Sequence, residues 1–209
     1  MTGRPATART RIKICGITTP DAARAAAAAG ADAIGLVFAA GSPREIDDHT
    51  ARGIVEALPP FVTTVGVLRD EPRRVPPVAF DLLQLHGAET EKDVARAERP
   101  VIRGFAFDEA QALRWDQCAN VRALLVDGPA AGSGRAFPHE ALLALMPRLR
   151  LPVILAGGLT PENVAEAIRA VRPYAVDVSS GVESAPGEKD PELIRAFCAA
   201  VRAADATRS

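Results

Sequence analysis

Aromatic residues, lysine, cysteine and net charge are all scarce in this 209-residue chain, and the shortages exclude several classes of protein. Aromatic residues make up 4% of the sequence, which leaves few side chains on which nucleic-acid bases could stack. The formal net charge is -1, so the chain lacks the strong positive field of a typical nucleic-acid binder. We therefore expect no nucleic-acid partner.

The three cysteines, Cys15, Cys118 and Cys198, are odd in number and widely spaced. This pattern fits neither a disulfide framework nor a CxxC metal site, and it predicts a reducing, cytoplasmic location. The first ten residues contain no apolar core, so we expect no signal peptide. No apolar run approaches the roughly 20 residues that span a bilayer, so we also expect no membrane association.

The chain does contain a regular alternation of short β-branched runs and alanine-rich helical stretches. Eight such units in 209 residues give about 26 residues per unit, near the lower size limit of a (β/α)₈ barrel. The alternative is a doubly wound open sheet, which normally uses fewer strands, and no GxGxxG motif follows the first strand. The predicted strands are residues 11–15, 33–38, 62–67, 82–85, 101–105, 123–126, 153–156 and 174–179.

We therefore predict an α/β protein with a single-domain (β/α)₈ TIM barrel over residues 11–205, preceded by a polar N-terminal tail over residues 1–10. Three of its helices have clear start signals, in which a capping side chain precedes a proline and an acidic residue. These signals are Thr19-Pro20-Asp21, Thr160-Pro161-Glu162 and Asp190-Pro191-Glu192.

Two neighbouring loops carry glycines in the arrangement of a phosphate site. Gly157 and Gly158 follow the seventh predicted strand, and Ser180 and Gly181 follow the eighth. Glycines let backbone N–H groups approach an anion, and these two loops form the usual phosphate site of a (β/α)₈ barrel. The alternative is that the glycines only form tight turns, but the two loops together favour phosphate binding.

Cys15 ends the first predicted strand, where a thiolate could remove a proton from a substrate carbon. Packing in the core is an equally good interpretation of its position. Side chains alternate along a strand, so a Cys15 at the barrel mouth places Lys13 in the barrel interior, where a buried ammonium group needs a partner. The eighth strand neighbours the first in a closed barrel, so we predict a Lys13–Asp177 ion pair.

Three further polar residues lie at or after strand ends, and each has two interpretations. Asp127 could donate a proton if burial raises its pKa, or it could begin a loop turn. Arg44 could bind a carboxylate through two hydrogen bonds, although an arginine after Ser-Pro is more often solvated. His86 is more often a hydrogen-bonded structural histidine than a catalyst.

The same strand ends resemble the motifs of the phosphoribosylanthranilate isomerase family. The resemblance covers roughly residues 11–203 in order, and it departs from the common pattern at Leu68-Arg69-Asp70 and Phe137-Pro138-His139. Neither departure changes a residue that we predict to be catalytic or to bind the substrate. The matching motifs are Lys13-Ile14-Cys15-Gly16-Ile17-Thr18, Ser42-Pro43-Arg44, Gln84-Leu85-His86-Gly87, Gly132-Ser133-Gly134, the stretch from Ile154 to Val164 and the stretch from Val176 to Glu183.

The resemblance implies an isomerase that carries out an Amadori rearrangement of a small phosphorylated substrate, N-(5-phosphoribosyl)anthranilate. It implies that Asp127 is the general acid at the ring oxygen and that Cys15 is the general base at C2′, with its thiol partly ionised by its surroundings. Arg44 is implied to hold the anthranilate carboxylate, and no metal or cofactor is needed, because the substrate nitrogen is the electron sink. The other candidate binding residues are His86, Gly157, Gly158, Asp177, Ser180 and Gly181.

Two other functions fit the same fold. A Schiff-base aldolase needs a strand lysine, and Lys13 lies two residues before the strand end, deeper than a substrate should reach. A catalytically silent phosphate-binding barrel would have no need of Cys15, Asp127 and Arg44 together. The sequence leaves open whether the chain is a monomer or a homodimer.

Overall fold

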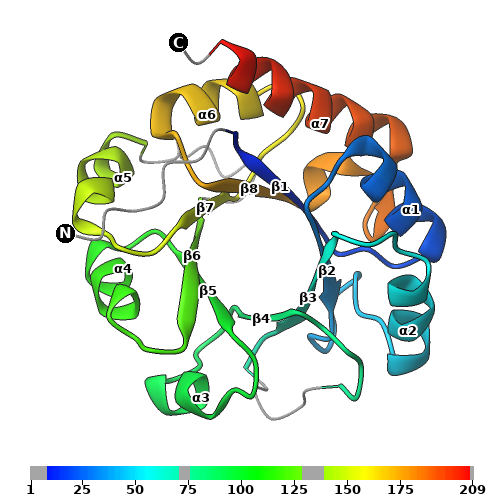
Figure 1. Cartoon of the computed structure of the whole chain (residues 1–209), viewed down its shortest axis with the longest axis horizontal. Helices are drawn as coiled ribbons and strands as arrows, with labels where there is room; N and C mark the ends of the chain where they lie inside the picture. The colour runs from blue at the N-terminus through cyan, green and yellow to red at the C-terminus, as the bar shows by residue number, and fades with distance from the viewer. Residues whose placement is uncertain (1–8, 71–75, 129–138, 208–209) are drawn as a thin grey trace.

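The predicted barrel is confirmed. The computed structural model describes residues 9–70, 76–128 and 139–207, in which eight parallel strands form a closed barrel with helices around its outside (Figure 1). Each predicted strand is present, with small shifts at the ends. The strands are β1 (Arg11–Cys15), β2 (Ala33–Val37), β3 (Thr63–Leu68), β4 (Leu82–Leu85), β5 (Val101–Ala106), β6 (Val121–Asp127), β7 (Val153–Ala156) and β8 (Ala175–Val178).

Among the described residues a helix follows every barrel strand except β3, and the helices cover the outer surface of the barrel (Figure 1). A short antiparallel hairpin, β9 (Glu183–Ala185) and β10 (Glu188–Lys189), comes between β8 and the last helix. Within the described ranges, no helix is long and apolar enough to cross a membrane. The helices are α1 (Pro20–Ala29), α2 (Asp48–Glu56), α3 (Glu91–Arg96), α4 (Glu109–Asp116), α5 (His139–Leu145), α6 (Val164–Val171) and α7 (Pro191–Ala206), with 3₁₀ turns at Met146–Arg148 and Ser180–Val182.

Side-chain alternation divides the apolar residues into two layers. Ile12 and Ile14 belong to the larger cluster, which packs the strands against the surrounding helices. Cys15 belongs to a smaller cluster inside the barrel, together with residues such as Val65 and Leu125. Because β1 pairs in parallel with β8, its inward-facing residues lie beside those of β8. The closure of the barrel therefore decides which polar side chains meet at its centre.

Two of the three predicted helix starts are confirmed, because Thr19 caps α1 and Asp190 caps α7 with side-chain hydrogen bonds. The predicted start at Thr160 is wrong, since α6 begins only at Val164. The reason lies in Asn163, whose Oδ1 accepts the Thr160 N–H and whose Nδ2 donates to the Gly158 carbonyl, both at 2.8 Å. These bonds hold the segment as a turn and tie it to the loop after β7.

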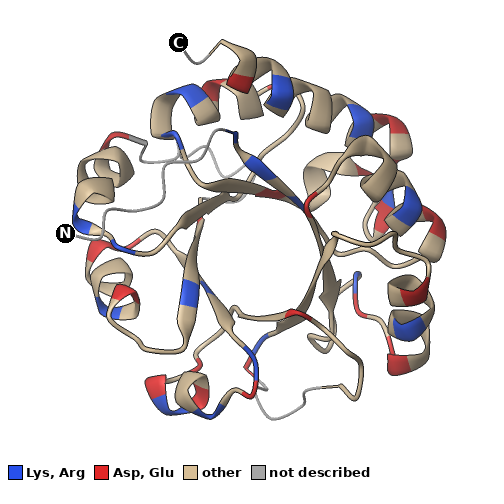
Figure 2. Cartoon of the chain, in the orientation of Figure 1, with Lys and Arg blue, Asp and Glu red and all other residues tan. Residues whose placement is uncertain are grey.

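Charged residues of both signs are interspersed over the outer helices (Figure 2). Some of them pair along a helix, as Arg24 does with Asp21 in α1 and Arg195 does with Glu192 in α7. Such exposed pairs contribute little stability, but they leave the outer surface without a strong field of one sign. The polar side chains that line a cavity lie instead at the barrel mouth, at the carboxyl ends of the strands.

Candidate active site

A cavity of about 500 Å³ lies at the carboxyl ends of the strands. Residues from β1, β4, β6 and β8 and from the loops after β2, β7 and β8 line it. Eight of the nine residues predicted for the site are among them, and the exception is Gly181. The eight are Cys15, Arg44, His86, Asp127, Gly157, Gly158, Asp177 and Ser180.

Lys13 and Asp177 form the predicted ion pair inside the barrel, and Asp177 also lines the cavity. The distance from Lys13 Nζ to Asp177 Oδ1 is 2.7 Å, and the two side chains are 4% and 9% exposed. On the neighbouring strand, a Cβ at Gly35 would come within 2.7 Å of Cys15 Sγ and 3.2 Å of Lys13 Nζ. The glycine therefore makes room for the thiol and the ammonium group side by side.

The thiol of Cys15 is buried, and burial raises its pKa. The Lys13 ammonium acts in the opposite direction, because a nearby positive charge favours the thiolate, but it does not overcome the burial. On balance the surroundings of Cys15 raise the pKa of its thiol, whereas the sequence analysis expected them to favour ionisation. Position along the chain could not reveal this, since desolvation depends on how the finished barrel encloses the group.

Asp127 ends β6 and lies against His86, which directly follows β4. His86 Nε2 is 3.4 Å from Asp127 Oδ2, and Gln84 Nε2 is 3.1 Å from His86 Nδ1. The Gln84 amide therefore contacts one ring nitrogen of His86, and the Asp127 carboxyl lies beside the other. Gln84 is a site residue that the sequence analysis did not single out, although it belongs to a quoted motif and alternation along β4 turns it inward.

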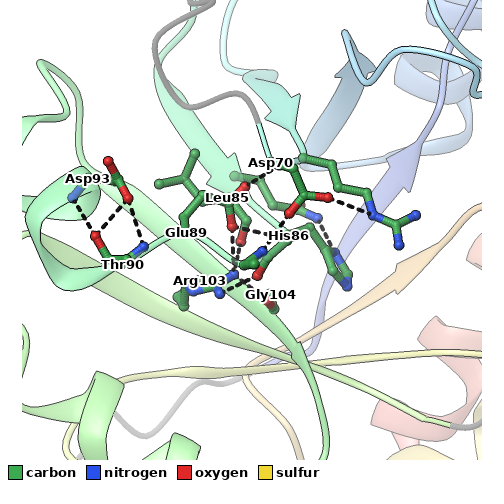
Figure 3. A network of polar contacts seen from close by, with 12 residues as sticks. Asp70, Leu85, His86, Glu89, Thr90, Asp93, Arg103 and Gly104 are labelled. Atoms are coloured by element: carbon green, nitrogen blue, oxygen red, sulfur yellow. Dashed lines mark hydrogen bonds and ion pairs between the residues drawn. The ribbon is translucent and has the colours of Figure 1, made fainter.

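A buried network behind His86 holds the loops that follow β3 and β4 (Figure 3). Arg103 Nη1 donates to the carbonyls of Leu85 and Gly104 at 2.6 Å, and Nη2 donates to the Gly87 carbonyl at the same distance. Glu89 lies 3.3 Å from the guanidinium and accepts the N–H groups of Gly87 and Asp70. The backbone on both sides of His86 is therefore fixed by one arginine and one glutamate.

Arg44 is not a solvated loop residue, because its guanidinium is held by Glu183 from β9. Nε and Nη2 of Arg44 each lie 2.7 Å from an oxygen of Glu183, and Lys189 Nζ lies 2.6 Å from the same carboxylate. The sequence analysis did not assign Glu183 or Lys189 to the site. The only signal for Lys189 was that lysine is rare in this chain.

The glycine-bearing loops pack against one another so closely that side chains would not fit. Gly157 has φ +88° and Gly158 has φ +63°, a region that L-residues rarely adopt. A Cβ at Gly157 would overlap the backbone N of Gly128, and one at Gly181 would overlap the Leu159 carbonyl oxygen. Tight packing therefore accounts for part of the glycine pattern. The third small-residue motif, Gly132-Ser133-Gly134, lies outside the described residues, as do Phe137 and Pro138.

The backbone N–H groups of the two predicted phosphate loops lie at the carboxyl ends of β7 and β8. Within the part of the chain that the structure describes, none of Gly157, Gly158, Ser180 and Gly181 donates its N–H to a backbone carbonyl. Since these loops end β7 and β8 beside the cavity, the site combines an anion-binding edge with a thiol and a carboxyl group. These features define the class of (β/α)₈-barrel enzymes that act on phosphorylated small molecules.

Comparison with known proteins identifies the family. The family model for N-(5'phosphoribosyl)anthranilate (PRA) isomerase matches residues 12–200. A relative from Acidithiobacillus ferrooxidans, named N-(5'-phosphoribosyl)anthranilate isomerase, is 49% identical over 203 residues, which cover 92% of this chain and 97% of the relative. The chain therefore belongs to the N-(5'-phosphoribosyl)anthranilate isomerase family, and the resemblance seen in its motifs is confirmed.

Solved structures agree with this assignment. The phosphoribosyl anthranilate isomerase of Thermotoga maritima shares 38% identity and a TM-score of 0.85, covering 93% of this chain and 99% of that chain. A phosphoribosyl anthranilate isomerase in complex with reduced 1-(o-carboxyphenylamino)-1-deoxyribulose 5-phosphate shares 37% identity and a TM-score of 0.83 with the same coverage. The Thermotoga maritima enzyme is dimeric, and structures of monomers generated from it are also known.

Proposed function

We propose that this chain catalyses the Amadori rearrangement of N-(5'-phosphoribosyl)anthranilate to 1-(2-carboxyphenylamino)-1-deoxyribulose 5-phosphate in tryptophan biosynthesis. Cys15 is the general base and Asp127 the general acid. The observation that carries the assignment is that both side chains line one cavity of about 500 Å³. They come from β1 and β6, which β7 and β8 separate in the closed barrel. A substrate bound between them therefore has an acid on one side and a base on the other.

The reaction needs one proton delivered and one removed. Asp127 gives its proton to the ribose ring oxygen, the C1′–O bond breaks, and the lone pair of the substrate nitrogen forms the C1′=N bond of a Schiff base. The Cys15 thiolate then takes the proton from C2′, and the electrons of that C–H bond move toward the nitrogen. The enol that results then gains a proton at C1′ and loses its hydroxyl proton at C2′, which gives the ketone of the product. Exchange with solvent returns a proton to Asp127 and removes the proton from Cys15. The reaction as proposed uses no metal and no organic cofactor, because the substrate nitrogen accepts the electrons.

Binding groups surround these two residues. Arg44 binds the anthranilate carboxylate, and the backbone N–H groups of the loops after β7 and β8 bind the phosphate. His86 and Asp177 line the same cavity and complete the binding set. Of the N–H donors, Gly157, Gly158 and Ser180 line the cavity, whereas Gly181 lies beside them in the same loop as Ser180.

The Schiff-base aldolase alternative requires a nucleophilic amine at Lys13. That amine is bound to Asp177 and is 4% exposed, so it is neither free nor accessible to a substrate carbonyl. Borohydride reduction in the presence of a sugar phosphate would give a stable adduct at Lys13 if the aldolase mechanism applied. We expect no adduct.

Loss of phosphoribosylanthranilate fluorescence, with the substrate made in situ, tests the proposed function. We expect turnover by the wild type and a loss of at least about 100-fold in both Cys15→Ala and Asp127→Asn, the scale of a general acid or base. Cys118→Ala is the matched control, since Cys118 does not line the cavity. Turnover that survives either substitution would contradict that residue's role, and a folded wild type without turnover would contradict the reaction.

We also propose the domain organisation, the location and the oligomeric state of the chain. We assign the catalytic barrel to residues 11–205 and the polar N-terminal segment to residues 1–10, of which residues 1–8 lie outside the described part of the chain. The three thiols Cys15, Cys118 and Cys198 are free, which supports a cytoplasmic location. The protein is a monomer or a homodimer, which light scattering of the purified chain decides.

A further inference from the structure

The hairpin after β8 supplies a buried charge cluster beside the cavity, formed by Glu183, Lys189 and Arg44. The side chains of Glu183 and Lys189 are 4% and 0% exposed, and that of Arg44 is 22% exposed. One carboxylate accepts hydrogen bonds from both cations, at 2.6 and 2.7 Å. The proposed mechanism assigns no step to either hairpin residue.

The contact between Glu183 and Arg44 fixes the orientation of the guanidinium plane. It uses the edge formed by Nε and Nη2, with each nitrogen donating to its own carboxylate oxygen. Because arginine carries five N–H donors, the edge formed by Nη1 and Nη2 can bind a second carboxylate while the first is held. The stem of Arg44 lies over Gly16, where a Cβ would overlap Arg44 Cδ, so the glycine after Cys15 also shapes this position.

The charges in the cluster do not cancel. Two cations share one carboxylate, and the further acceptors of Lys189 Nζ among the described residues are both neutral: the Ser179 carbonyl at 3.0 Å and the Ser179 hydroxyl at 3.4 Å. Burial tends to raise the pKa of Glu183, but the hydrogen bonds from Arg44 and Lys189 hold that pKa below its usual value. One positive charge is left over at the edge of the cavity, and an anionic substrate group that meets Arg44 balances it.

We propose that Glu183 and Lys189 are positioning residues that aim Arg44 at the substrate carboxylate and thereby set the preference for an anthranilate over an unsubstituted aniline ring. Glu183 holds the guanidinium by one edge, and Lys189 holds Glu183 from the other side. This inference rests on the proposed function, in which Arg44 binds the anthranilate carboxylate.

Calorimetric binding of two ligands tests the inference. The first is reduced 1-(o-carboxyphenylamino)-1-deoxyribulose 5-phosphate, and the second is the same molecule without the ring carboxyl group. In Glu183→Gln, which keeps the shape but removes the charge, we expect the Kd of the first ligand to rise about tenfold, the scale of one charge-assisted hydrogen bond. The Kd of the second ligand should change less than about twofold. Lys189→Met should act in the same direction and serves as the second variant if Glu183→Gln does not fold.

Steady-state kinetics provide a second readout. Since Arg44 contacts a part of the substrate that does not react, we expect Glu183→Gln to raise KM and to leave kcat nearly unchanged. Glu188→Gln is the matched control: Glu188 lies in the same hairpin, is exposed and does not line the cavity. Its Kd values and its KM should equal those of the wild type.

Comparison with Arg44→Ala separates this inference from the proposed function. If Arg44→Ala loses the preference for the carboxylate ligand and Glu183→Gln keeps it, the positioning role is wrong and the binding role of Arg44 stands. If Arg44→Ala keeps the preference, the binding role of Arg44 is wrong, and the inference with it. Equal weakening of both ligands in Glu183→Gln would mean general damage to the site and would also overturn the inference.

Discussion

Lys13 and Asp177 are 164 positions apart in the sequence, yet Lys13 Nζ lies 2.7 Å from Asp177 Oδ1 inside the barrel. The register of the β1–β8 pairing places the two residues directly opposite each other. These are the first and last strands of the barrel, so the ion pair forms only when the barrel closes. Both charges are almost fully buried, and each depends on the other for compensation.

We expect Asp177→Asn to lower the free energy of unfolding by about 3 kcal/mol, because it leaves the Lys13 ammonium buried without its counterion. The double variant Lys13→Met/Asp177→Asn removes both charges and should be more stable than Asp177→Asn alone. Urea unfolding followed by circular dichroism measures both differences. A double variant that is less stable than either single variant would show that the charges do not depend on each other.

The raised pKa of Cys15 predicts the pH dependence of the reaction. A thiol that must lose its proton to act as a base becomes active only as the pH approaches its pKa, so kcat/KM should rise with pH through neutrality. Burial raises this pKa and the Lys13 ammonium lowers it. In Lys13→Met the opposing positive charge is gone, and the rising limb of kcat/KM should therefore move to higher pH.

The shift is measured from pH profiles of kcat/KM and, independently, from thiolate absorbance in variants that lack Cys118 and Cys198. Lys92→Met is the control, since this lysine lies in α3, on an exposed surface away from the cavity. A rising limb that stays in place in Lys13→Met, or moves to lower pH, would contradict the proposed effect of Lys13 on the thiol.

Local sequence patterns were enough to predict the strands, the closed barrel and the contact between Lys13 and Asp177. Alternation decides which side chains point inward, and closure decides that β1 lies beside β8, so the pair follows from two general rules. The same reasoning failed at Thr160, where Asn163 forms hydrogen bonds that hold a turn in place of the first helical turn.

The residues that the sequence did not reveal depend on contacts between distant segments. Glu183 reaches Arg44, and Lys189 supports Glu183, only because a hairpin with no periodic pattern of its own folds back over the loop after β2. The raised pKa of Cys15 likewise depends on how completely the finished structure removes water from the thiol. Neither the partners of an ion pair nor the extent of desolvation can be read from residue spacing.

We expect Gly181→Ala to weaken the binding of ribose 5-phosphate at least about tenfold. The added Cβ would overlap the Leu159 carbonyl oxygen and push the loop after β8 away from the loop after β7. Calorimetry measures the binding, and Gly53→Ala is the control, because a Cβ at that position in α2 meets nothing within 4 Å. Unchanged phosphate binding in Gly181→Ala would mean that the two loops do not act together.

The buried pair of Arg103 and Glu89 makes a separate prediction about the loop that carries His86 (Figure 3). The two side chains are 3% and 0% exposed, and Arg103 packs over the ring of Trp115, with Cζ 4.8 Å from the ring centroid. Glu89→Ala leaves this guanidinium without a counterion and releases the N–H groups of Gly87 and Asp70. We expect it to lower the free energy of unfolding by about 3 to 5 kcal/mol.

The exposed ion pair between Arg114 and Glu91 supplies the control. Both side chains are more than half exposed, at 54% and 55%, so water screens their interaction. Glu91→Ala should therefore cost about 1 kcal/mol or less. Similar losses in Glu91→Ala and Glu89→Ala would show that burial does not set the strength of these pairs.

Hydrogen exchange identifies which backbone amides lose protection in Glu89→Ala. Glu89 accepts backbone N–H groups on both loops, so Glu89→Ala should speed the exchange of the amides of Asp70 and Gly87 before global unfolding. His86 lies between these loops and Asp127, and kcat/KM should fall in parallel with the loss of protection. If stability falls but these amides keep their protection, the pair supports the barrel as a whole and has no particular effect on the loop beside Asp127.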